Sequence, residues 1–223
     1  MKKYKILLLV IVIVQVFFSI PVFAKDVANN SEFVTTKLIE GVTVEASIKS
    51  SLPNESVKAV ITEKPVDNTM YMLTDENDIV KSYEVIYIIP KMEGQYTDIT
   101  PLTEDGGFKE EIGARAEITI VYNYDSLNDL IDIKRVYGGW TPDSSLYYIT
   151  DREVIYRADS MFTGYVEKKN PSSNSFNYYP DWGYVPYYPN TAYSLTGAFS
   201  WAKIRVYDMT AYYDIHVAVK VQR

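Results

Sequence analysis

The C-terminal stretch AFSWAKIRVYDMTAYYDIHVAVKV, Ala198–Val221, decides the fold class. Apolar and polar residues alternate on both sides of its centre, DMT at 208–210, with the period of two that turns successive side chains to opposite faces of a strand. The short polar centre predicts a β-hairpin between two strands. One row of the first strand suits a core: Ser200, Ala202, Ile204 and Val206. The opposite faces carry the charges Lys203, Arg205, Asp214 and Lys220.

The same alternation continues through most of the chain, and no long helical pattern interrupts it. In YEVIYII, Tyr83–Ile89, one face is apolar or aromatic at every position. Because Ile86 and Ile88 make the second face apolar as well, we expect this strand to be buried on both sides. SLNDL at 126–130 predicts one helical turn. About ten strands joined by short turns predict an all-β fold, a single antiparallel β-sandwich or flattened barrel.

The first 24 residues have the three-part order of a secretory signal peptide. A basic start with Lys2, Lys3 and Lys5 precedes an apolar run, and Pro21 is followed by Val22-Phe23-Ala24. We therefore expect a cleavable signal helix at 1–24 and cleavage after Ala24; an uncleaved membrane anchor is the competing interpretation. The remaining chain divides into a flexible N-terminus, 25–32, and one β-sandwich domain, 33–223. No later segment is long and apolar enough for an integral membrane span.

Composition narrows the classes of partner. The chain has no cysteine, so disulfides, thiol catalysis and cysteine-based zinc sites are excluded. With the signal peptide, this predicts a secreted, extracellular protein of a bacterium. Loss of the three signal-peptide lysines leaves 19 basic against 29 acidic residues, a net charge of −10. Such a chain repels nucleic acids on average, so we expect no nucleic-acid partner.

A long aromatic loop is predicted at 170–191. Its centre, FNYYPDWGYVPYYPN at 176–190, has seven aromatic residues, three prolines and a single charge, Asp181. Disordered segments are charged and poor in aromatic residues, so the loop is expected to be ordered. Gly183 is suited to a turn with positive φ. The candidate ligand-binding residues are Tyr179, Trp182, Tyr184, Tyr187 and Tyr188, together with Trp140 after Gly138-Gly139.

Two interpretations of this loop remain open. In the first, it covers one end of the sandwich and Trp182 is a buried plug, because aromatic residues contribute mainly through buried area. In the second, exposed rings form a platform for a glycan or an extracellular protein partner, since Tyr and Trp dominate binding hot spots. Contact with a membrane interface is a third possibility. For Trp140, a core position after a sharp turn competes with a binding role.

Catalytic and metal-binding patterns are weak. His216 is the only histidine; Asp214 shares its face and Ser200 lies on the partner strand, but the set lacks an oxyanion site and a strained nucleophile turn.

Glu110-Glu111 is expected to point to opposite faces of a strand. Asp75-Glu76-Asn77-Asp78 offers oxygen ligands for calcium but lacks the glycine and distal glutamate of an EF-hand. We therefore assign no catalytic residue, no metal and no cofactor, and leave enzyme activity uncertain.

These observations predict a secreted, non-catalytic recognition protein that binds a glycan or protein partner through its Tyr/Trp-rich loop. The alternatives are a membrane-acting or structural β-rich secreted protein of the toxin type, and a carboxylate-based glycan hydrolase, for which no pair of residues stands out.

Overall fold

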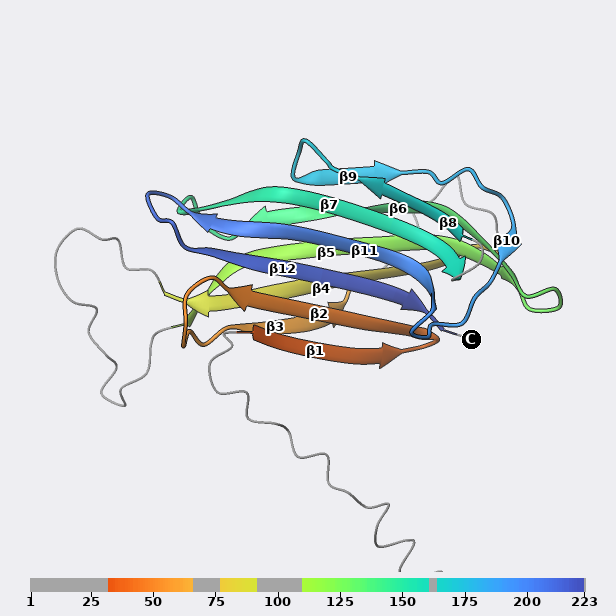
Figure 1. Ribbon diagram of the computed structural model, residues 1–223, viewed down its shortest axis with the longest axis horizontal. Helices are drawn as coiled ribbons and strands as arrows, with labels where there is room; N and C mark the ends of the chain where they lie inside the picture. The colour runs from red at the N-terminus through yellow and green to blue at the C-terminus, as the bar shows by residue number, and fades with distance from the viewer. Residues whose placement is uncertain (1–31, 66–76, 92–109, 161–163, 223) are drawn as a thin grey trace, which may run out of the picture.

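The computed structural model describes residues 32–65, 77–91, 110–160 and 164–222, which form two antiparallel sheets (Figure 1). The predicted signal peptide, 1–24, lies outside the described residues. So does the predicted flexible N-terminus apart from Glu32, which begins the first strand. None of the described residues belongs to a helix with the length and apolar character that a membrane span requires.

The first sheet is built around the predicted C-terminal hairpin. Its order is β1 (Glu32–Ile39), β2 (Val42–Ser50), β12 (Tyr212–Val221), β11 (Ser194–Val206), β7 (Tyr147–Ser160) and β8 (Gly164–Lys169). In the hairpin, Ala198 lies opposite Val219 and Ile204 opposite Tyr213. The turn at 208–210 joins β11 to β12, so the expectation from the alternating pattern is confirmed.

The second sheet has the order β10 (Val185–Pro186), β6 (Leu130–Pro142), β5 (Glu110–Asp125), β4 (Ile79–Pro90) and β3 (Lys58–Glu63). A further strand, β9 (Ser175–Tyr178), pairs with β6 on the same side as β10. The segment predicted as one long loop at 170–191 thus contains two short strands. They supply backbone hydrogen-bonding partners for β6, which is the last long strand on that side of the sheet.

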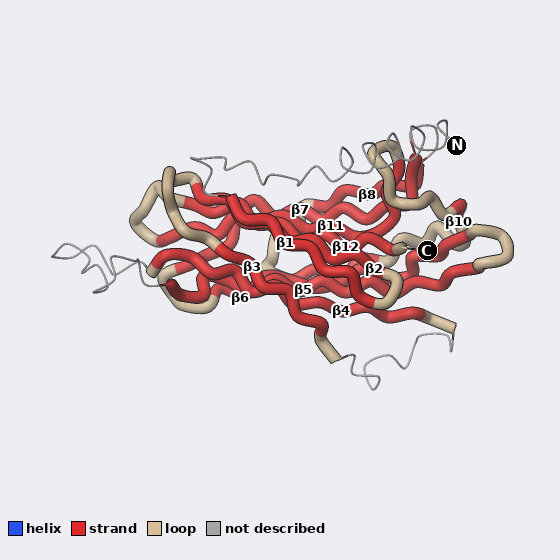
Figure 2. The backbone as a smooth tube through the Cα atoms, turned by 90° about the horizontal axis from the view of Figure 1, so that it is seen from below, coloured by secondary structure: helices blue, strands red, loops and turns tan. Residues whose placement is uncertain are grey.

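The core lies between the two sheets, which are seen as two layers in Figure 2. The inward rows of β2, β4, β11 and β12 are buried, including Ser200, Ala202, Ile204 and Val206 of the predicted core row. The Tyr87 hydroxyl donates to the His216 carbonyl across the interior, 2.8 Å away. The expectation that Tyr83–Ile89 is buried on both sides is wrong: Ile86 and Ile88 are only partly buried, because they lie on the outward face of the sheet.

The segment at 126–129, between β5 and β6, is a turn rather than the predicted helical turn. Asp125 nevertheless caps this turn. Its Oδ1 accepts the amides of Leu127 and Asn128 at 3.0 and 3.2 Å. The described residues include no helix.

Candidate functional site

The aromatic segment, defined as residues 170–190, is held against the edge of β6. β9 pairs with β6 so that Tyr178 lies opposite Val136 and Phe176 opposite Gly138, and β10 pairs further along, with Val185 opposite Ile131. Pro186 lies in this outermost strand, as expected for a residue that cannot donate to a ladder on both sides. The segment is therefore an ordered extension of the sheet.

Two glycines allow the approach of β9 to β6. A Cβ atom on Gly139 would lie 2.4 Å from the Asn174 carbonyl oxygen, and one on Gly138 would lie 2.0 Å from that of Glu117. Trp140, the next residue, donates its backbone N–H to the Asn174 carbonyl at 2.7 Å. The glycines thus let a strand pack tightly on each side of β6, and they direct the Trp140 ring into the core, where it is 2% exposed.

A row of aromatic rings crosses from one sheet to the other beneath the segment. Trp140 of β6 contacts Phe176 of β9, and the row continues through Tyr178 to Tyr156 of β7, with centroid distances of 5.2 to 6.1 Å. Trp182 completes it, 5.7 Å from Tyr156. The rings close this side of the molecule between β6 and β7. This supports a structural role for Trp140 and, for the buried part of its ring, for Trp182.

Glu167 of β8 anchors Trp182. One carboxylate oxygen accepts the Trp182 indole N–H at 3.0 Å, and the other accepts the Tyr156 hydroxyl at 2.8 Å and pairs with Lys169 at 2.7 Å. These contacts, that of Lys169 first, lower the pKa of Glu167, while burial raises that of Tyr156. The Trp182 ring also lies 5.7 Å from Tyr165. One residue of the aromatic segment is thus fixed to the opposite sheet.

The turn that carries Trp182 relies on two residues with positive φ. Gly183 has a φ of 64°, which confirms the expectation for this glycine, and Asp181 has a φ of 40°. Asp is one of the non-glycine residues that tolerate this region. The turn projects Tyr179 and Tyr184 outward on either side of Trp182. They are 62% and 53% exposed.

The second half of the segment is fixed to both sheets. The Tyr187 amide donates to the Asp129 carbonyl at 2.8 Å, and the Asn190 side-chain amide donates to the Val221 carbonyl at the end of β12. The Thr196 hydroxyl donates to the Tyr188 carbonyl at 2.9 Å. As a result, Tyr187 is 8% exposed and Tyr188 is partly buried.

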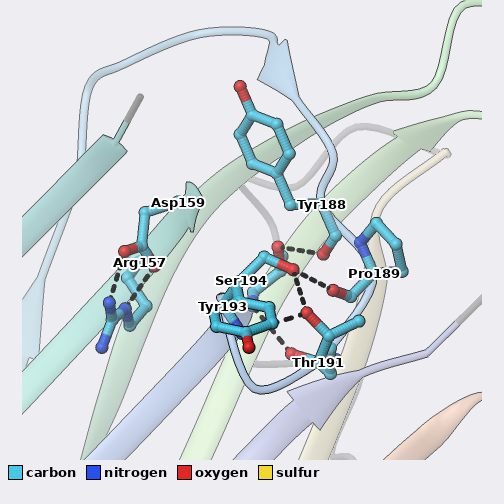
Figure 3. A network of polar contacts seen from close by, with 9 residues as sticks. Arg157, Asp159, Tyr188, Pro189, Thr191, Tyr193 and Ser194 are labelled. Atoms are coloured by element: carbon cyan, nitrogen blue, oxygen red, sulfur yellow. Dashed lines mark hydrogen bonds and ion pairs between the residues drawn. The ribbon is translucent and has the colours of Figure 1, made fainter. Parts of the chain in front are cut away.

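A small hydrogen-bonded turn follows at 189–194 (Figure 3). The Ser194 hydroxyl donates to the Pro189 carbonyl, and the Thr191 amide donates to the Ser194 carbonyl at 2.9 Å. The Arg157–Asp159 ion pair of β7 is seen beside it in the same view, and Asp159 lies opposite Leu195 in the register of β7 and β11. This turn fixes the direction in which the aromatic segment enters β11.

The six candidate residues thus fall into three groups. Tyr179 and Tyr184 are exposed, and Trp182 and Tyr188 are partly buried. Trp140 and Tyr187 belong to the core, so their rings offer no exposed face. The structure brings Tyr179, Trp182 and Tyr184 together on one turn and separates Trp140 from them.

A polar cluster beside Tyr179 was not anticipated from the sequence. Arg135 and Tyr137 point outward from β6; Asn177 of β9 lies opposite Tyr137, and Tyr179 directly follows the end of β9. The Arg135 guanidinium lies 4.4 Å from the Tyr137 ring centroid and 5.4 Å from that of Tyr179. Its Nε donates to the Asn177 side-chain oxygen at 2.8 Å. The period-two spacing of Arg135 and Tyr137 is the only sequence signal for this arrangement.

Tyr187 also lines a cavity of about 320 Å³. Tyr122 and Tyr124 of β5 form its wall, and Tyr124 meets the Tyr187 ring edge-on at 5.3 Å. Lys81 and Glu40, which form an ion pair at 2.9 Å, contribute polar atoms. The cavity is mostly apolar.

The residues considered for catalysis do not form a site. His216 lies on the outward face of β12, stacked on Trp201 at 4.6 Å, whereas Ser200 points into the core. Glu110 and Glu111 diverge as expected: the first pairs with Lys58, and the second accepts the Tyr147 hydroxyl. No group of three or more His, Cys, Asp or Glu side chains within the described ranges is arranged to hold a metal.

The acidic cluster considered for calcium, residues 75–78, lies only in part within these ranges. Asp75 and Glu76 are outside them, and Asp78 forms an ion pair with Lys134 at 2.8 Å.

Comparison of the chain with models of known protein families, with curated protein sequences and with solved structures finds no significant match.

Proposed function

We propose that the chain is a secreted, non-catalytic recognition protein, a β-sandwich preceded by a signal peptide, which binds a glycan through the rings of Tyr179 and Tyr184. One observation carries the proposal: two exposed tyrosine rings stand on a segment that is otherwise hydrogen-bonded or packed along its length. A fixed backbone reduces the conformational entropy lost when these side chains bind a ligand.

The surroundings of the two rings favour a glycan. Sugar rings combine apolar C–H faces, which pack on aromatic rings, with hydroxyls that need hydrogen-bonding partners. Tyr179 supplies a ring face, and Asn177 and Arg135 beside it supply an amide and N–H donors. Trp182 presents only part of its indole, and Tyr187 and Trp140 support the segment from below.

Alanine variants test the proposal. Binding of the purified protein to a glycan array identifies a ligand, and titration calorimetry then compares the wild type with Tyr179→Ala and Tyr184→Ala. We expect at least one variant to bind about tenfold more weakly, a change of about 1.4 kcal/mol. Tyr207→Ala is the matched control, because Tyr207 is 56% exposed and lies in the β11–β12 turn at the other end of the molecule (Figure 1).

Two results would reject the proposal. One is the absence of binding to every glycan on the array. The other is a bound glycan whose affinity is unchanged in both Tyr179→Ala and Tyr184→Ala.

The export part of the proposal is tested separately. The mature protein is expected in the culture medium with Lys25 as its first residue, because the signal-peptidase pattern ends at Ala24. N-terminal sequencing of the secreted protein checks this, and recovery of the intact chain from the membrane fraction contradicts it.

A further inference from the structure

Arg135 has no ion-pair partner within the described part of the chain. Other cations of the same sheet do form ion pairs: Lys134 pairs with Asp78, and Arg115 with Asp143. Its one hydrogen bond within the described part of the chain is from Nε to Asn177. In a chain with 29 acidic residues, a guanidinium without a carboxylate partner is notable, because acidic side chains are abundant.

The guanidinium is nevertheless held in a defined orientation. The centroids of the Tyr137 and Tyr179 rings lie 4.4 and 5.4 Å from its Cζ, and these contacts restrain the tilt of the guanidinium plane. The hydrogen bond to Asn177 restrains its rotation within that plane. Occupation of Nε by Asn177 leaves the N–H groups of Nη1 and Nη2. Two of these point in parallel, the arrangement that binds both oxygens of a carboxylate at once.

We infer that Arg135 forms a carboxylate subsite beside the Tyr179 ring, and that the ligand is an acidic glycan carrying carboxylated sugars. This inference rests on the proposed glycan-binding function and specifies its ligand class. The sugar ring packs on Tyr179, which remains 62% exposed beside Arg135. Its carboxylate accepts two hydrogen bonds from the Arg135 terminal nitrogens.

A carboxylate fits this subsite better than a phosphate polymer. The cluster contains one cation, and phosphate recognition usually gathers several cations or backbone N–H groups around one anion. The negative charge of the chain opposes any anionic ligand over long distances, but this repulsion is screened beyond roughly 8 Å at physiological salt. Recognition therefore depends on the local contact with Arg135.

The experiment compares two ligands that differ only at their carboxyl groups. Oligogalacturonate and its fully methyl-esterified form have the same sugar rings and hydroxyls, but only the first carries carboxylates. Titration calorimetry measures both against the wild type, Arg135→Gln, Arg135→Lys and Tyr179→Ala. Lys49→Gln is the control for net charge, because Lys49 is exposed on the other sheet and has no ion pair among the described residues.

We expect the wild type to bind oligogalacturonate at least tenfold more tightly than the ester. Arg135→Gln abolishes this preference. In Arg135→Lys, the logarithm of the affinity ratio between acid and ester is less than half of the wild-type value, since an ammonium lacks the parallel donors. Tyr179→Ala weakens the binding of both ligands, and Lys49→Gln changes neither. Thermal melting of each variant confirms that it is folded. If Arg135→Gln is unstable, Arg135→Lys still tests the subsite, because it keeps a cation beside the two rings.

Other outcomes overturn the inference in distinguishable ways. Equal binding of acid and ester, or a preference that survives in both Arg135 variants, rejects the carboxylate subsite and leaves the glycan function standing. Failure to bind these and all neutral glycans on the array rejects the function itself. Tighter binding of poly-glutamate than of oligogalacturonate, lost in Arg135→Gln, assigns the subsite to an acidic protein instead.

Discussion

Trp182 and Tyr184 are two residues apart on one turn, yet they meet different surroundings. Trp182 contacts Tyr156 and Tyr165 and donates a hydrogen bond to Glu167, whereas Tyr184 is more than half exposed. The two side chains therefore separate the structural role of the segment from its proposed binding role.

We expect Trp182→Ala to lower the free energy of unfolding by about 2–4 kcal/mol, because it removes ring contacts and leaves Glu167 without its indole donor. Tyr184→Ala is expected to change it by no more than about 0.5 kcal/mol. Urea unfolding of both variants measures the difference. Equal losses would contradict the division of roles between the two rings.

His216 gives the molecule a predictable response to acid. Its imidazole is partly buried and stacks on Trp201, and the buried Nε2 atom has no hydrogen-bond partner among the described residues. Burial lowers the pKa of His216 from 6.5 to about 4; Glu45 on β2 acts in the opposite direction, and Lys220 adds to the lowering. The folded protein thus binds this proton less readily than the unfolded chain does.

The stabilising effect of neutral His216 is complete above pH 6.5 and is lost as the pH falls from 6.5 to 4, where the unfolded chain is protonated and the folded protein is not. The loss amounts to about 2–3 kcal/mol, since one unit of pKa corresponds to about 1.4 kcal/mol. Unfolding free energies of the wild type and His216→Phe at pH 7 and pH 4 isolate this contribution. A wild-type loss no larger than that of His216→Phe would rule it out.

At the scale of elements, the pairing of β6 with β9 positions the candidate site. It places Asn177 opposite Tyr137 and brings Tyr179 to Arg135. The pairing depends on Gly139, which lies against the Asn174 carbonyl.

We expect Gly139→Ala to destabilise the protein by about 2–4 kcal/mol and to weaken ligand binding, because a Cβ 2.4 Å from the Asn174 oxygen pushes β9 away from β6. Gly183→Ala is the control. Its Cβ has open space within 4 Å, so only its positive φ costs free energy, about 1 kcal/mol. Urea unfolding and amide hydrogen exchange in β9 measure the effect; unchanged exchange in β9 would exclude this mechanism.

The elements differ in how far the sequence predicts them. β4, β5, β11 and β12 each contain a stretch of alternating buried and less buried residues, and a period of two is a local signal that needs no knowledge of partners. β9 and β10 are too short and too rich in proline and polar residues to show it, and they pair with a strand about 40 and about 55 residues earlier, respectively. For the same reason, the sequence identifies Tyr179, Trp182 and Tyr184 but not their proximity to Arg135.

At the scale of the whole molecule, tyrosines fill much of the space between the sheets. Tyr83, Tyr87, Tyr156 and Tyr213 have exposures of 0–1%, and burial raises the pKa of each well above its usual value. Burial also raises the pKa of Tyr122, to about 12. The neutral phenol is therefore stabilised in the folded protein relative to the unfolded chain.

This stabilisation is complete below pH 10 and declines as the pH rises above 10, where tyrosines of the unfolded chain ionise first. We expect cooperative alkaline unfolding, with the buried tyrosines ionising together as the fold is lost. Absorbance at 295 nm and circular dichroism, recorded on one pH series, follow the two events. Independent ionisation of the tyrosines near pH 10 in a still-folded protein would disprove the account.

The anchoring of Trp182 has a mechanical consequence. The aromatic segment is hydrogen-bonded to β6 of one sheet and, through Glu167, to β8 of the other. A ligand bound there, as proposed, and pulled away by fluid flow would apply tension to this segment. That tension divides between two sheets and acts on several hydrogen bonds at once, so the segment resists being peeled from either edge alone.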